Sequence, residues 1–133
     1  MRVLVISTSP PEYLGGLAHF TKNLINYLGK NGIQVDFLCS TLSKEGPFIE
    51  QYQKNVRIIK KKSYLFSDND NFFRIKNPIF NVLTYLLKYG RNYDLIHVHS
   101  YIYFSTIQTF IYKTFFNKNI PVILHLHGGV QTQ

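Results

Sequence analysis

The chain has 133 residues, of which 45% are hydrophobic and 17% charged; this composition suits a globular protein and excludes a disordered one. The length fits a single domain with one core. With 15 basic and 7 acidic residues the formal net charge is +8, which favours phosphate-bearing or anionic partners, including nucleic acid and acidic membranes.

The single cysteine, Cys39, lies inside an apolar run, so a disulfide framework is excluded and a reducing compartment is expected. We predict that Cys39 is a small buried hydrophobic residue. No apolar stretch reaches the roughly 20 residues of a membrane-spanning helix. Because the N-terminus leads directly into a strand pattern, no signal peptide is expected, and the protein is predicted to be cytoplasmic.

Five short apolar runs, spaced along the chain, predict β-strands, and most are apolar nearly throughout, as strands buried on both faces are. They are Val3–Ser7, Val35–Cys39, Val56–Lys60, Leu95–His99 and Val122–His127. Helical spacing predicts helices between them, at Leu17–Leu28, Pro78–Tyr89 and Tyr103–Phe116. The connection between the second and third strands and the segment Ser63–Asn77 are predicted to be irregular.

This alternation of strands and helices predicts an α/β fold with a doubly wound parallel sheet, in which the five strands take the order 3-2-1-4-5. Ligands of such sheets bind beyond the carboxyl ends of the strands. Four segments of this sequence are expected at that edge, namely Ser7–Gly16, Cys39–Thr41, His97–Tyr101 and His125–Val130.

The first of these segments ends in two adjacent glycines, Gly15 and Gly16, immediately before a predicted helix. Glycines let a ligand approach the backbone, and a helix N-terminus favours phosphate, so a phosphate site is one interpretation. A tight turn without a ligand is the other. A dinucleotide fingerprint is absent, since the third glycine is missing and Asp36 lies too early, and no lysine stands in P-loop register. His19, on the first helical turn, faces either a ligand or solvent.

Two histidine pairs end the last two predicted strands: His97 with His99, and His125 with His127. Residues two apart on a strand share a face. The pairs supply up to four imidazoles for a metal; alternatively, His127 contacts a sugar or phosphate while His97 and His125 are hydrogen-bonded core residues. The nearest acid, Asp94, stands at the opposite end of its strand, so the sequence predicts no stoichiometric metal.

A basic and aromatic segment begins at Lys60–Lys62 and continues to Tyr93. One interpretation is a core helix with a solvated basic rim. The other is a docking surface for an anionic membrane, where each basic residue contributes about 1 kcal/mol. Nucleic acid is not predicted as a partner, because no nucleic-acid recognition fold is apparent.

Four stretches together resemble the N-terminal domain of a glycosyltransferase of the GT-B fold, most similar to the glycogen-synthase-like group, family 4. They read "VLVIS", "GGLAHFTKNLINYLGKNGIQVDFLC", "YDLIHVHS" and "PVILHLHG". The resemblance covers residues 1–37, 93–101 and 120–129, and the segment between residues 40 and 92 does not contribute to it.

The resemblance implies that residues 1–133 form the acceptor-side, Rossmann-like domain of a two-domain enzyme whose C-terminal donor-binding domain is absent from this chain. Such an enzyme transfers a sugar from a nucleotide-sugar donor to a saccharide or lipid-linked acceptor. No cofactor is implied, and the chain alone is expected to be inactive. A non-catalytic binding or membrane-docking half of a split transferase, peripheral on the inner face of the cell membrane, is the alternative. A flavodoxin-like phosphate-binding domain is disfavoured, because its fingerprint is missing.

Site residues follow from the same resemblance. Gly15 and Gly16 would approach the donor diphosphate, and His127 would be catalytic, because its carbonyl or ring could stabilise the positive charge that develops on the transferred sugar. Gly128 follows His127 in the "HG" position, and His99 would line the acceptor side. His19 completes the expected set of substrate-binding residues.

Overall fold

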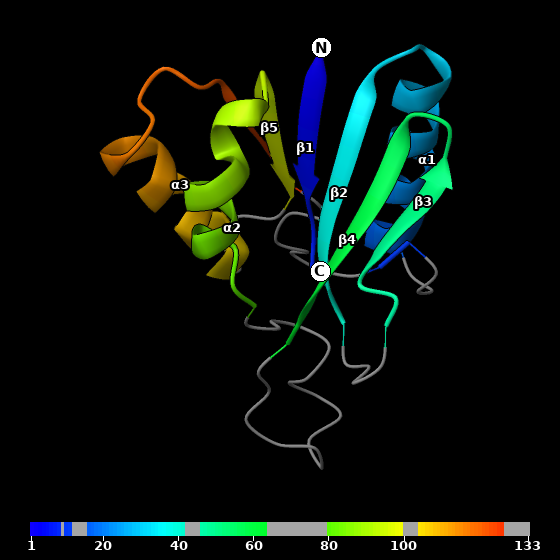
Figure 1. Ribbon diagram of the computed structural model, residues 1–133, viewed down its shortest axis with the longest axis horizontal. Coiled ribbons are helices and arrows are strands. Elements are labelled where there is room, and N and C mark those ends of the chain that lie inside the picture. Colours follow the sequence, from blue (N-terminus) through cyan, green and yellow to red (C-terminus); the bar gives the residue numbers. More distant parts are fainter. Residues whose placement is uncertain (9, 12–15, 42–45, 64–79, 100–103, 127–133) are drawn as a thin grey trace, which may run out of the picture.

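The computed structural model describes residues 1–8, 10–11, 16–41, 46–63, 80–99 and 104–126. Within these ranges a six-stranded sheet has the order β3-β4-β2-β1-β5-β6 (Figure 1). The strands are β1 (Arg2–Ile6), β2 (Gln34–Thr41), β3 (Ile49–Gln53), β4 (Val56–Lys62), β5 (Leu95–His99) and β6 (Val122–His125). The helices are α1 (Gly16–Lys30), α2 (Leu83–Tyr89), the short 3₁₀ helix η1 (Gly90–Asn92) and α3 (Phe104–Phe115).

The predicted strand order is confirmed, since the five expected strands are β1, β2, β4, β5 and β6, and every pairing among them is parallel. The doubly wound parallel sheet is confirmed for these five strands. The predicted irregular connection after β2 is wrong, because it contains a sixth strand, β3, which pairs antiparallel with β4 at one edge of the sheet. Its sequence, "IEQYQ", is mostly polar and at least partly exposed, because an edge strand has a neighbour on one side only. The apolar pattern that identified the other strands is therefore absent from β3.

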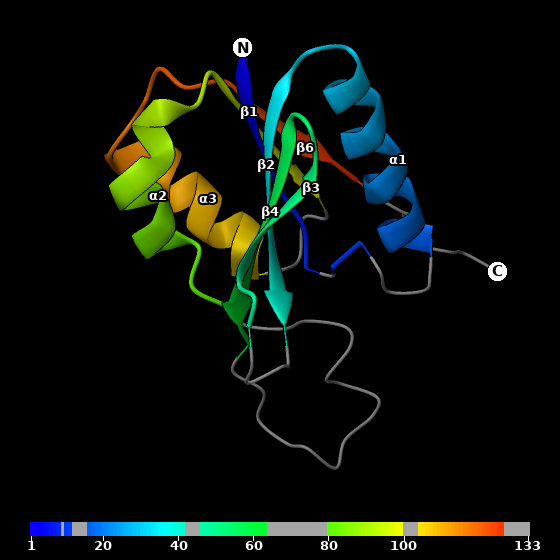
Figure 2. The same cartoon turned by 45° about the vertical axis from the view of Figure 1, so that its right-hand side comes forward.

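Helices cover both faces of the sheet: α1 lies on one side, and α2 and α3 lie on the other (Figure 2). The alternation of side chains along the strands produces two cores. The core on the α1 face contains Val3, Val5, Ile25, Val35, Phe37, Cys39, Val56 and Ile58. The core on the α2–α3 face is built around Leu4, Ile6, Leu38, Phe80, Leu86, Ile96, Val98 and Tyr112. Cys39 is fully buried, as predicted.

Helix α1 ends in a glycine turn that places β2 beside β1. Gly32 has a φ of 80°, a conformation that costs glycine little, and the Ile33 amide donates to the Leu28 carbonyl at 3.1 Å. One turn earlier the helix touches the sheet closely, since a Cβ at Gly29 would lie 2.7 Å from Cγ2 of Val56. The lack of a side chain at Gly29 lets the helix pack closely against β4, while Gly32 allows the turn that follows the helix.

Helix α2 has only seven residues, and α3 holds its N-terminus in place. The Gln108 side chain on α3 accepts hydrogen bonds from the Val82 and Leu83 amides at 3.0 and 2.9 Å. Its Nε2 donates to the Phe80 carbonyl at 2.8 Å. These contacts satisfy amides that a helix leaves without an internal partner, so α2 and α3 form one unit.

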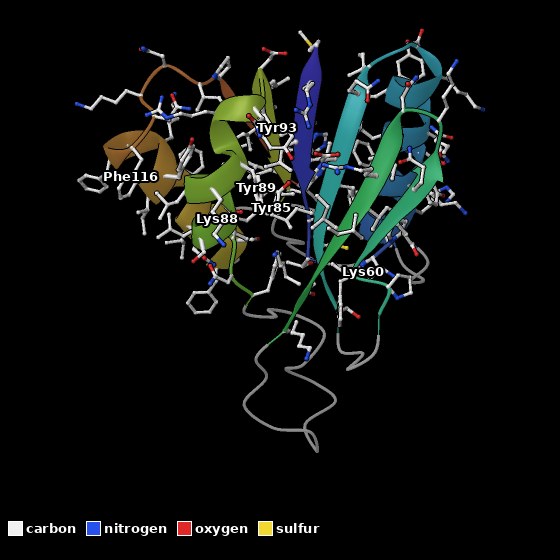
Figure 3. All side chains as sticks on the ribbon, in the orientation of Figure 1. Lys60, Tyr85, Lys88, Tyr89, Tyr93 and Phe116 are labelled. Carbon is white, nitrogen blue, oxygen red and sulfur yellow. The ribbon has the colours of Figure 1, made fainter. Side chains whose placement is uncertain are left out.

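A buried acid on β2 joins this unit to the sheet. Asp36 accepts two hydrogen bonds from the Arg57 guanidinium, at 2.9 and 2.8 Å, and one from the Tyr93 hydroxyl at 2.5 Å. The Tyr85 hydroxyl on α2 lies 2.5 Å from that of Tyr93, and Figure 3 shows the two rings between α2 and the strands. Arg2 adds a second positive charge, 3.5 Å from the carboxylate.

The pKa of the Asp36 carboxyl is lowered below its ordinary value of 3.8. Burial, the largest single influence, raises this pKa. The hydrogen bonds from Arg57 and Tyr93 and the charges of Arg57 and Arg2 together lower it by more than burial raises it. Burial and the hydrogen bond to Asp36 raise the pKa of Tyr93. Asp36 is therefore a negatively charged residue with a structural role within the sheet.

Candidate functional site

The carboxyl ends of the parallel strands meet at one edge of the sheet, and buried polar side chains gather there. The loop that leaves β1 is tied to β2, because the Ser7 amide donates to the Leu38 carbonyl at 3.0 Å and the Ser40 amide donates to the Thr8 carbonyl at 3.3 Å. The Ser40 hydroxyl also donates to the Thr8 carbonyl. Ser7, Thr8, Ser40 and Thr41 are each at most 8% exposed. The floor of this edge is therefore fixed and rich in hydroxyl groups.

Helix α1 begins at this edge with Gly16 and has 15 residues, none of them acidic in the first turn. Its positive N-terminal end therefore has no acidic side chain in the first turn to offset it, which favours an anion. Gly16 is exposed, and a Cβ built there would meet no atom of the described residues within 4 Å. Packing does not require glycine at this position, so the open backbone remains available to a ligand.

The predicted site residues divide into three groups. Gly16 and His99 lie at the expected edge. His19 is exposed on α1, where its Nε2 lies 3.2 Å from Nδ2 of Asn23, so it faces solvent beside its own helix. Gly15, His127 and Gly128 lie outside the described residues, and the predictions for these three stay predictions.

The structure brings three histidines together on the α1 face. His99 of β5 stands opposite His125 of β6 in the strand register, and His97 lies two residues before His99. Ring centroids are 4.5 Å apart for His97 and His99, 5.4 Å for His99 and His125, and 5.7 Å for His97 and His125. His99 is fully buried, whereas the other two are half-buried. We call His97, His99 and His125 the histidine cluster.

Phe20 on α1 covers part of this cluster. Its ring centroid lies 4.7 Å from that of His125 and 6.0 Å from that of His99. The sequence predicted the helix that carries Phe20, but the contact of Phe20 with the imidazoles follows from the pairing of β5 with β6. The hydroxyls of Ser7 and Thr8 could have been anticipated only as members of a segment expected at this edge.

Among the described helices, none combines the length and the apolar character needed to cross a lipid bilayer.

Comparison with known proteins gives a consistent result. The sequence model of Glycosyltransferase Family 4 matches residues 14–132. Two solved structures of sucrose-phosphate synthase from Thermosynechococcus elongatus share the fold. The first has a TM-score of 0.64 at 19% identity, over 87% of this chain and 31% of that chain. The second has a TM-score of 0.66 at 17% identity, over 96% of this chain and 64% of that chain. No curated protein matches the sequence.

The structural similarity confirms the α/β, Rossmann-like fold. The family match includes Gly15, Gly16 and both histidine pairs, and it begins after β1. Because this match extends over most of the chain, the resemblance seen in the sequence is confirmed, and the chain belongs to glycosyltransferase family 4.

Proposed function

We propose that this chain is the acceptor-side half of a GT-B sugar transferase, and that the carboxyl edge of its sheet faces the diphosphate of a nucleotide-sugar donor. One observation carries the proposal: the N-terminus of α1 opens at Gly16 above a floor of buried hydroxyls, beside the histidine cluster. Open backbone amides at a helix N-terminus suit a phosphate group. Membership of family 4 supplies the chemical class.

In the proposed reaction, the bond from the anomeric carbon to the diphosphate oxygen breaks, and the diphosphate leaves with the bonding electron pair. The acceptor oxygen forms the new bond to the anomeric carbon, and its proton passes to the oxygen of the departing diphosphate. Gly15 and Gly16 approach the diphosphate, while His127 contacts the sugar and offsets the positive charge that develops on it, with Gly128 keeping the backbone there open. This half supplies the acceptor side, and a C-terminal domain supplies most donor contacts.

His99 takes a different role in this proposal. Its ring is fully buried beneath neighbours that include Phe20, so an acceptor cannot reach it without a rearrangement. We assign it to the support of the acceptor side, where it holds its neighbours in position. His19 is exposed and lies at the rim, where a substrate could contact it.

Saturation-transfer NMR tests the proposed ligand class, because it detects binding as weak as an isolated half would show. The chain is mixed in turn with nucleoside diphosphate sugars, free nucleoside diphosphates, NAD and ATP. Transfer of magnetisation to the diphosphate sugars in preference to NAD supports the proposal. Equal transfer of magnetisation to all of these ligands, or transfer to none of them, would contradict the proposed ligand class. Multiple turnover by the chain alone, above a no-protein control, would contradict the proposed division into two halves.

A second candidate function is a membrane-docking half, and the outer surface of α2 and α3 favours it. Leu87 and Tyr89 are 51% and 47% exposed beside Lys88, and Figure 3 shows Lys88 and Phe116 on this outer side. Between α3 and β6, a hollow of about 470 Å³ is lined by Thr106, Ile107, Phe110, Ile111, Thr114, Phe115 and Leu124, and its apolar residues are exposed. A transferase that docks on a membrane through this surface would have access to lipid-linked acceptors.

The three lysines that suggested docking from the sequence are partly engaged within the protein. Lys60 lies 3.9 Å from the Glu50 carboxylate, and the Lys61 ammonium is 5.5 Å from the centroid of the Tyr85 ring. Lys62 stands 5.7 Å from the centroid of the Phe48 ring. The outer surface of α2 is therefore the better-supported docking surface, and residues 64–79 of the predicted surface lie outside the described residues.

A further inference from the structure

The histidine cluster gathers three metal-ligating side chains from two adjacent strands. His97, His99 and His125 each offer one ring nitrogen, and the three nitrogens lie within 4.8 Å of one another. Parallel pairing places His99 opposite His125, and the two-residue period of a strand places His97 on the same face. The backbone of the sheet therefore places all three residues side by side on one face.

The spacing is close to that of a metal site. Zinc binds imidazole nitrogen at about 2.0–2.1 Å with tetrahedral angles, which separates bound nitrogens by roughly 3.4 Å. The cluster must therefore contract by roughly an ångström or somewhat more. The final torsion of a histidine side chain has a broad energy profile, so ring rotation supplies this movement without a shift of the strands.

We propose that the histidine cluster binds a transition metal ion of the zinc class through His97, His99 and His125, with a fourth position left open. Imidazole is the preferred donor for zinc, cobalt, nickel and copper, whereas magnesium and calcium prefer oxygen. Three protein ligands with an open fourth position is the arrangement of catalytic rather than structural zinc sites.

Burial suits such a site. His99 lies at the closed end, fully buried, while His97 and His125 are half-buried and give the ion an entry path. Phe20 packs against His125 at 4.7 Å between ring centroids, so an apolar wall limits water on that side. Because fewer water molecules surround the ion there, its electrostatic attraction for an anion or a water molecule in the open position is stronger.

This inference goes beyond the proposed function and departs from the prediction made from the sequence. That prediction relied on the lack of nearby carboxylates. A three-imidazole site requires none, and the decisive fact is the register of β5 and β6, which pairs His99 with His125. The sugar-transfer proposal does not require the metal, so either proposal can fail alone.

Cobalt titration of the tag-free chain tests the site, because tetrahedral cobalt absorbs visible light far more strongly than octahedral cobalt in buffer. We expect about one cobalt ion per chain with the tetrahedral spectrum, displaced by zinc and unaffected by excess magnesium. His125→Gln and His97→Gln should each weaken binding by at least tenfold, a change at least as large as the loss of an outer partner of a metal ligand.

His19→Gln is the matched control, because His19 is an exposed histidine outside the cluster. It should bind cobalt like the unmodified chain, and circular dichroism should show each variant folded. The proposal is overturned if the unmodified chain gives no tetrahedral spectrum. It is equally overturned if folded His125→Gln and His97→Gln bind as tightly as the unmodified chain, or if His19→Gln loses binding to the same degree. If either cluster variant fails to fold, the other variant and the spectrum of the unmodified chain decide.

Discussion

Asp36 shows how one side chain can link two layers of the fold. Its carboxylate accepts hydrogen bonds from Arg57 of β4 and from Tyr93, which lies between η1 and β5. The Asp36 side chain is 7% exposed, against 43% for Arg57. Because the guanidinium is partly in water, screening weakens the ion pair, and most of its value lies in the hydrogen bonds. A neutral residue at position 36 would leave the buried Tyr93 hydroxyl and the Arg57 guanidinium without a charged acceptor.

This contact predicts a pH dependence of stability. The folded pKa of Asp36 is below its ordinary value of 3.8, so its contribution is present in full above that value and disappears as the pH falls further. Asp36→Asn should lower the free energy of unfolding by about 2 kcal/mol at neutral pH. Urea denaturation at neutral pH and near pH 3 should show that the difference between variant and unmodified chain shrinks in acid.

Asp94→Asn serves as the control in that experiment, because Asp94 is an exposed acid that accepts a hydrogen bond from the Arg2 amide at 2.8 Å. A smaller loss is expected from it at neutral pH. An Asp36→Asn variant as stable as the unmodified chain would contradict the structural role given to this carboxylate.

Gly16 gives a residue-scale test of the phosphate proposal that leaves the fold intact. A Cβ at this position meets nothing within 4 Å, so Gly16→Ala should change the free energy of unfolding by less than about 1 kcal/mol. The methyl group would still obstruct a diphosphate that approaches the helix N-terminus. Saturation transfer to a nucleoside diphosphate should therefore fall. An unchanged signal in Gly16→Ala would place the diphosphate elsewhere.

At the scale of elements, α2 is the part of the described structure that depends most on a partner. A helix of seven residues is too short to be stable alone, and Gln108 of α3 satisfies its first amides. We predict that Gln108→Leu destabilises the protein by about 1–3 kcal/mol, since it leaves polar groups without partners. Hydrogen exchange should become faster in α2 before it does in β1 or β2.

Gln108→Glu is the matched variant for that prediction. It keeps an oxygen acceptor for the Val82 and Leu83 amides, with a negative charge that a helix N-terminus favours. It loses the Nε2 group that donates to the Phe80 and Phe104 carbonyls. Its stability should lie between those of the unmodified chain and Gln108→Leu. Equal destabilisation by both variants would mean that the donor, rather than the cap, secures α2.

The elements also show what the sequence could and could not predict. Buried strands such as β1 and β2 are apolar runs, so their positions and order followed from pattern and chain connectivity. Strand β3 was missed because its side chains alternate between solvent and partial burial, with no apolar signal. The role of Gln108 and the contact between His99 and His125 depend on residues 25 or more apart in sequence, which no local pattern encodes.

At the scale of the whole molecule, the net charge of +8 and the exposed apolar residues of α2 and α3 lead to a prediction about membranes. The chain should sediment with vesicles of acidic lipid at low salt and remain in the supernatant with neutral vesicles or at high salt. Lys88→Glu should weaken this binding by at least about fivefold, given roughly 1 kcal/mol for each basic residue.

Lys30→Glu changes the net charge equally but lies at the end of α1, on the other face of the sheet. It should retain more vesicle binding than Lys88→Glu. Equal losses would indicate a nonspecific effect of charge, and recovery in the supernatant under every condition would leave α2 as ordinary solvated surface and favour a soluble saccharide acceptor.

In the proposed function, the carboxyl edge of the sheet, at the start of α1, faces the donor diphosphate. Amide chemical-shift mapping with a nucleoside diphosphate tests it most directly, because the opposite end of the sheet offers a rival anion site: a polar hollow of about 370 Å³ whose lining includes Arg2, Lys54 and Arg57. We expect concentration-dependent amide chemical-shift changes at Gly16, Ala18 and Ser40. Shifts confined to Arg2, Lys54 and Arg57 would contradict the proposal.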